Sequence, residues 1–119
     1  MKKDNIIQLK SFQFAIRIVK VYQYLTTEKK EYILSKQLMR SGTSIGANIE
    51  ESIGAQSDKD FYSKLTIAYK EARETHYWIR LLTETNYLTS KEENSLLKDT
   101  EEILRIITSI QKTIKEKNS

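Results

Sequence analysis

Cysteine and proline are absent from this 119-residue sequence, and glycine occurs only three times. Without cysteine the chain can form no disulfide, no thiolate zinc site and no iron–sulfur cluster, and it has no cysteine nucleophile. A β-sandwich needs many turns, which depend on glycine and proline. The composition therefore disfavours an all-β fold and favours long helices. His76 is the single histidine, which excludes a metal site built from several histidines.

Long apolar runs are also missing. No run approaches the roughly 18 residues that a membrane span requires. The first residues, MKKDNIIQLKS, include two lysines but no apolar stretch long enough for a signal peptide. We therefore expect a cytoplasmic protein that does not enter a membrane.

Apolar periodicity predicts a single all-α domain over residues 1–119. Helices are expected at about residues 11–25, 31–55 and 57–84, followed by one from about residue 90 to 114, with residues 1–8 and 115–119 loosely ordered. Short connections between successive long helices imply antiparallel neighbours. The predicted fold is an up-down-up-down four-helix bundle.

Polar residues mark the expected helix ends. Ser57 is suited to cap the third helix, and Asn86 is expected to end it in the left-handed conformation. Two overlapping capping boxes can start the fourth helix: Thr89 with Glu92, and Ser90 with Glu93.

The first helix carries two apolar stripes, whereas a helix packed on one face needs only one. The stripes lie on different sides of the helix and consist of Leu9, Phe12, Ile16 and Val19, and of Phe14, Ile18, Val21 and Leu25. The second of these, left in water, would form an unusually large exposed patch. We therefore expect a homo-oligomer whose contact surface is the Phe14–Leu25 stripe.

The second helix contains Gly42 and Gly46 on its packing face. Glycine inside a helix costs about 1 kcal/mol relative to alanine, so two glycines four residues apart predict that another helix backbone passes close by. The opposite side carries a line of polar residues, which serves either as a helix-to-helix network or as a binding surface: Arg40, Ser44, Asn48 and Glu51.

Positive charge is concentrated at the start of the chain. The net charge is +4, and residues 1–30 hold seven Lys or Arg against two Asp or Glu. Clustered cations can bind nucleic-acid phosphates without reading sequence, although a mild excess can also serve only solubility. The candidate phosphate contacts are Lys2, Lys3, Lys10, Arg17 and Lys20.

No motif supports catalysis or a cofactor. A di-iron bundle needs Glu-x-x-His pairs, but Arg73 stands three residues before His76. Glu71 and Glu74 lie near His76 and could take part in acid–base chemistry, yet ordinary ion pairing on the helix surface explains them better. Neither a G-x-S-x-G elbow nor a glycine-rich phosphate loop is present. We expect a protein that is not an enzyme, with His76 in a packing or interface role beside Tyr69.

Four motifs in order resemble a known family. They are Lys10–Ala15, Ser41–Glu51 (SGTSIGANIEE), Asp60–Trp78 and Asn86–Leu88. Together they are similar to the signature of the four-helix-bundle proteins encoded in intervening sequences of 23S ribosomal RNA genes. Arg40, Ser44, Asn48 and Glu51 match that signature.

The resemblance implies a limited set of properties. The family is similar in fold to the accessory protein of diversity-generating retroelements; both are associated with homopentamers around a central channel, and nucleic-acid binding has been proposed for them. No enzymatic activity is established for the family. A pentamer is therefore expected, and two functions stay open: binding of RNA or DNA through the basic surface, or a structural module with one dedicated protein partner.

Overall fold

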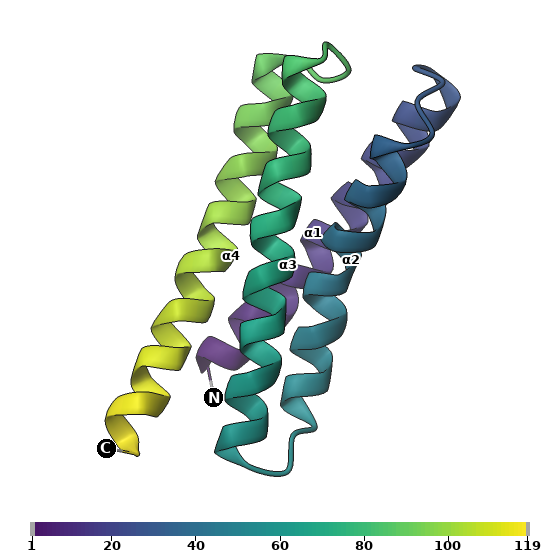
Figure 1. Cartoon of the computed structure of the whole chain (residues 1–119). Coiled ribbons are helices and arrows are strands. Elements are labelled where there is room, and N and C mark those ends of the chain that lie inside the picture. The colour runs from purple at the N-terminus through teal and green to yellow at the C-terminus, as the bar shows by residue number, and fades with distance from the viewer. Residues whose placement is uncertain (1, 119) are drawn as a thin grey trace.

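The computed structural model describes the backbone of residues 2–118 and the side chains of residues 6–118. It contains four helices, α1 (Lys2–Thr27), α2 (Leu34–Ile53), α3 (Asp58–Glu84) and α4 (Ser90–Lys117). The helices alternate in direction (Figure 1). Helix α1 packs on α2 and α4, and α3 packs on the same two helices, so α1 and α3 occupy diagonal positions. The predicted up-down-up-down four-helix bundle is confirmed.

Apolar residues from all four helices form one core. On α2, α3 and α4 the apolar residues that form a stripe along each helix are largely buried, and burial of this apolar surface is the main favourable term in folding. Ile53 is an exception, because 46% of it is exposed. The buried members of these stripes are Leu38, Ile45, Ile49, Leu65, Ala68, Ala72, Ile79, Leu82, Leu96, Ile103, Ile107 and Ile110.

The stripe of α1 that enters this core is the one predicted to form the oligomer surface. Phe14, Ile18 and Leu25 are 1%, 0% and 0% exposed, and Val21 packs against the same core. That prediction is wrong, because the inner face of α1 is already covered by its own chain. The other stripe of α1 remains at the surface.

The backbone approach predicted at the two helix glycines occurs at Gly46, whereas at Gly42 the close neighbour is a side chain of α1. A Cβ atom on Gly42 would lie 2.8 Å from Cγ1 of Ile18, and one on Gly46 would lie 3.4 Å from the backbone oxygen of Ser11. The first distance is shorter than real contacts allow, whereas the second is close to ordinary van der Waals contact. Gly42 therefore makes room for the Ile18 side chain, and Gly46 faces the backbone of α1.

The capping predictions agree with the structure. The hydroxyl of Ser57 accepts a hydrogen bond from the Asp60 N–H at 3.1 Å. Thr89 and Glu92 form the complete capping box at the start of α4. Asn86 adopts a φ of 72°, which ends α3 in the left-handed region.

Several helix boundaries differ from the prediction. Helices α1 and α4 extend over the segments predicted to be loosely ordered, and Ile7 belongs to the core at 2% exposure. Helix α2 starts at Leu34 rather than at residue 31 because Glu31 caps it: its carboxylate accepts from the N–H groups of Leu34 at 3.0 Å and Ser35 at 2.7 Å. Burial raises the pKa of Glu31, but these backbone hydrogen bonds outweigh burial and lower it overall.

Within residues 2–118, no helix is both long enough and apolar enough to cross a bilayer.

Candidate interaction surfaces

The predicted basic stripe is largely used inside the molecule. The Lys10 ammonium lies 3.2 Å from Glu102, and the Arg17 guanidinium lies 2.7 Å from Asp99. Both acids belong to α4, so these ion pairs join α1 to α4 within one chain. Lys20 is exposed, with no ion pair among the residues whose side chains are described. The side chains of the other two candidates, Lys2 and Lys3, lie outside the described residues.

The C-terminal end of α1 leans away from α4 (Figure 1). A groove beside Arg17 lies between these two helices. This α1–α4 groove encloses about 350 Å³. Its apolar floor is made by Val21, Leu88 and Leu96, and its lining also includes Lys20 and Lys91. The charge pattern does not indicate Lys91, because the charges of α4 balance and nothing local shows that the first turn of α4 faces the end of α1.

The polar line of α2 makes contacts of two kinds. Arg40 pairs with Glu71 at 3.3 Å and with Glu74, and both acids belong to α3. At the other end of the line, Glu51 pairs with Lys64 of α3 at 3.0 Å. The two outer members of the line are thus part of a helix-to-helix network.

The two middle members of that line bond within α2. Ser44 donates to the Arg40 carbonyl at 2.6 Å, and Asn48 donates to the Ser44 carbonyl at 2.8 Å. These bonds satisfy the polar side chains without reaching another helix. The line is therefore a helix-to-helix network only at its ends.

The acidic residues near His76 do not gather around it. His76 Nε2 lies 3.1 Å from Glu101 on α4, whereas Glu74 bonds toward α2. A hydrogen bond from Trp78 at 2.9 Å and another from Arg40 lower the pKa of Glu74. The carboxylate–histidine set is therefore divided between two sides of α3. Among residues 6–118, no three His, Cys, Asp or Glu side chains are placed to hold a metal ion.

The outer face of α1 is apolar. We define the outer stripe as Ile6, Leu9, Phe12 and Ile16, which are 45%, 58%, 62% and 43% exposed. Two apolar side chains of α3, Ile67 and Tyr77, are also 42% and 48% exposed, but they lie ten residues, or about 15 Å of helix, apart. They belong to the helix diagonal to α1 and do not extend the outer stripe.

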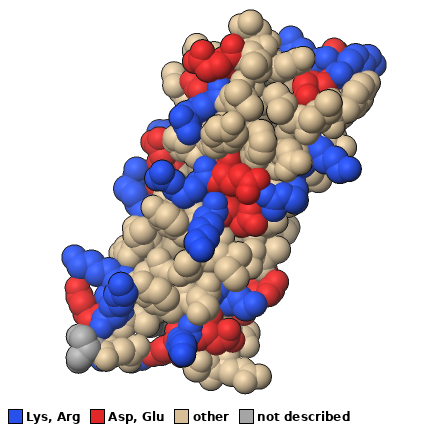
Figure 2. All heavy atoms as spheres, in the orientation of Figure 1, with Lys and Arg blue, Asp and Glu red and all other residues tan. Residues whose placement is uncertain are grey.

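Figure 2 shows the side of the bundle on which α3 lies in front. Acidic and basic side chains are interspersed there, with uncharged areas between them. Neither sign of charge forms a continuous field on this side. The face therefore lacks the clustered cations that non-specific phosphate binding requires.

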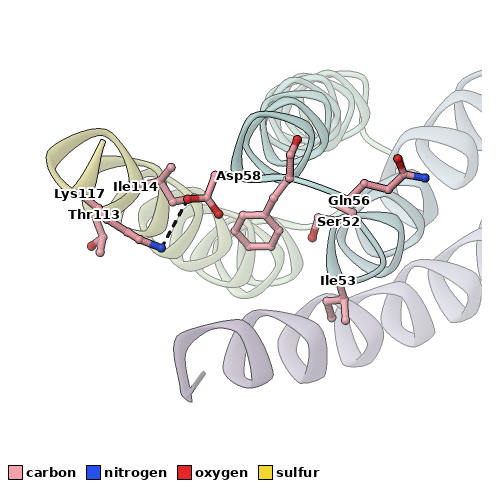
Figure 3. Close-up of a pocket in the computed structure, with 10 residues that line it drawn as sticks. Ser52, Ile53, Gln56, Asp58, Thr113, Ile114 and Lys117 are labelled. Carbon is pink, nitrogen blue, oxygen red and sulfur yellow. Dashed lines mark ion pairs between the residues drawn. The ribbon is translucent and has the colours of Figure 1, made fainter. Parts of the chain in front are cut away.

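The largest cavity described lies at the end of the bundle opposite the α1–α4 groove, between the α2–α3 connection and the end of α4 (Figure 3). It encloses about 550 Å³. Lys117 and Asp58 pair across it at 3.4 Å, and the Ser52 hydroxyl donates to the Ile49 carbonyl. The ionisable groups in its lining therefore satisfy each other and leave no charge free for a ligand.

These surfaces define an antiparallel four-helix bundle joined by ion pairs between helices, with one apolar helix face left uncovered. The chain belongs to the 23S rRNA-intervening sequence protein family, whose sequence profile matches residues 3–109.

A solved structure supports the same assignment. The chain is similar to the crystal structure of a protein of unknown function from the S23 ribosomal protein family of Bacteroides thetaiotaomicron, with 52% sequence identity and a TM-score of 0.92. The match covers 92% of this chain and 98% of that one. No curated protein matches the sequence.

Proposed function

We propose that this protein is a non-enzymatic cytoplasmic scaffold that assembles with copies of itself through the outer stripe of α1. The observation that carries the proposal is the exposure of Leu9 and Phe12, at 58% and 62%, on a helix whose other face is already in the core. Buried apolar surface contributes about 25 cal/mol per Å². Large contiguous apolar patches on soluble proteins generally mark interaction sites.

The exposed apolar side chains of α3 suggest how copies would meet. Contact between the outer stripe of one copy and Ile67 or Tyr77 of the next would join two different surfaces. Such head-to-tail contacts form closed rings when the rotation between copies closes. The arrangement is compatible with the pentamer that the family resemblance implies, and we propose that number.

Nucleic-acid binding through the predicted basic stripe has less support. Lys10 and Arg17 already pair with acids of α4, so binding phosphate there would require these ion pairs to break. A dedicated protein partner would use the same outer stripe as a second copy does. The mass of the purified protein separates these two occupants.

Light scattering or analytical ultracentrifugation of the purified chain at micromolar concentration tests the proposal. We expect the wild type to have the mass of several chains, and Leu9→Gln/Phe12→Gln to have a much lower mass with unchanged helical circular dichroism. Ile33→Gln is the matched control, because Ile33 is 76% exposed in the connection before α2, and it should leave the mass unchanged. A monomeric wild type would overturn self-assembly and favour the dedicated protein partner.

A further inference from the structure

We infer that the α1–α4 groove binds an unpaired nucleotide of a single-stranded nucleic acid, with the base on the apolar floor and the phosphate between Lys20 and Lys91. This inference is independent of self-assembly, because it uses the C-terminal half of α1 and none of the outer-stripe residues. It also differs from binding along the basic stripe. Both surfaces include Lys20, but Lys10 belongs to the stripe alone and Lys91 to the groove alone.

The size and the apolar floor of the groove suit one flat apolar ring. Leu88 and Leu96 are 5% and 2% exposed and form the floor of the groove together with Val21. Tyr24, at 38% exposure, supplies an aromatic ring in the lining. A volume of about 350 Å³ is at the small end of ligand sites. An unstacked base can lie against such a surface, whereas the bases of a duplex are stacked inside it.

The charges of the groove favour an anion. Its lining holds Arg17, Lys20 and Lys91 against the single carboxylate of Glu92. Arg17 is neutralised by Asp99, and Glu92 accepts the Thr89 N–H at 2.8 Å in the capping box. Lys20 and Lys91 are exposed on α1 and α4, and neither forms an ion pair in the part of the chain with described side chains. Two ammonium groups beside an apolar floor match a phosphate attached to a base.

A neighbouring cavity favours a strand over a free nucleotide. This second cavity encloses about 340 Å³ and shares Tyr24, Leu88 and Glu92 with the groove. Lys29 also lines it, and its ammonium lies 5.9 Å from the centre of the Tyr24 ring. The two adjoining cavities can thus hold successive nucleotides, with Tyr24 at their boundary. Sequence-tolerant stacking on aromatic rings beside cations is how single strands are commonly bound.

Fluorescence anisotropy with a labelled oligouridine of about 12 nucleotides, within the usual site sizes, tests the inference. The titration is run at about 50 and about 200 mM salt, where phosphate contacts separate clearly. We expect the log–log salt slope to be steeper for the wild type than for Lys20→Gln/Lys91→Gln by about 1.4, since each single-strand contact contributes about 0.7. Tyr24→Leu should weaken binding roughly tenfold through lost stacking without changing the slope.

The matched control is Lys36→Gln/Lys70→Gln, which removes the same charge from exposed positions on α2 and α3. It should keep the wild-type slope, and all variants should keep the wild-type melting curve and mass. An equal loss in the control would overturn the inference, as would no binding by the wild type at the lower salt. Equal affinity for a duplex of the same length would contradict the unpaired base. If uridine monophosphate bound as tightly as the oligouridine, the inference of a bound strand would be wrong and the groove would be a site for a free nucleotide.

Discussion

The inner and outer faces of α1 are both apolar, yet their surroundings differ completely. Phe14 is 1% exposed and Phe12, two positions earlier, is 62% exposed. The difference comes from the neighbouring helix: α2 places Gly42 against Ile18, so a bulky side chain fits there and α1 can approach closely. Periodicity within one helix thus shows how many faces are apolar, whereas the size of residues on the partner helix decides which face is buried.

Alanine substitutions on the two faces should separate these roles most strongly. Phe14→Ala leaves a cavity in the core and should lower the free energy of unfolding by about 3–5 kcal/mol, at every protein concentration. Phe12→Ala removes no core contact, so its effect should appear mainly as a changed dependence of stability on protein concentration. Urea denaturation at several protein concentrations measures both. Equal, concentration-independent losses would show that the two faces of α1 are not distinct.

The two glycines of α2 test the reason for the difference. Alanine gains up to about 1 kcal/mol of helix propensity at either position. At Gly42 the added methyl group would meet Ile18 at 2.8 Å, and overpacking of this kind typically costs about 1–3 kcal/mol. Gly42→Ala should therefore lower the melting temperature, whereas Gly46→Ala should leave it unchanged or raise it.

A larger side chain at the second glycine extends this test. The nearest atom to a Cβ on Gly46 is a backbone oxygen of Ser11, which cannot rotate away. Gly46→Leu should therefore destabilise the bundle by more than about 1 kcal/mol. A raised melting temperature for Gly42→Ala, or an unchanged one for Gly46→Leu, would contradict the close crossing.

The sequence predicts local features of this fold better than contacts between helices. The caps at Ser57 and Thr89 and the left-handed Asn86 agree with the structure, because each depends on residues within one turn. The burial of α2, α3 and α4 also follows the apolar spacing along each helix, which is a property of that helix alone. For α1 the pattern is ambiguous because both stripes are apolar, and the stripe predicted to form the oligomer surface lies in the core.

The candidate site was harder to predict for a physical reason. Whether a lysine is available to a ligand depends on which acids face it from other helices. Lys10 and Arg17 face Glu102 and Asp99, a pairing that requires the register between α1 and α4. Lys91 becomes part of a groove only because those two helices diverge. A count of charges along the chain gives neither the register between α1 and α4 nor the divergence of the two helices.

The ion pair between Arg17 and Asp99 lies at the edge between the two faces of α1, and its effect should be the smallest. Both side chains are 40% exposed, so the pair should contribute only about 0.3–1 kcal/mol. A double-mutant cycle of Arg17→Met and Asp99→Asn, measured by urea denaturation at low salt, gives this coupling energy. The coupling should shrink as salt is raised, and a cycle with Lys20→Met in place of Arg17→Met should give none. Because Arg17 also donates to Ser95 at 2.9 Å, Arg17→Met should cost more than Asp99→Asn. A coupling of zero would mean that the core alone determines the position of α1 against α4, and that Arg17 is as available to an anion as Lys20 is.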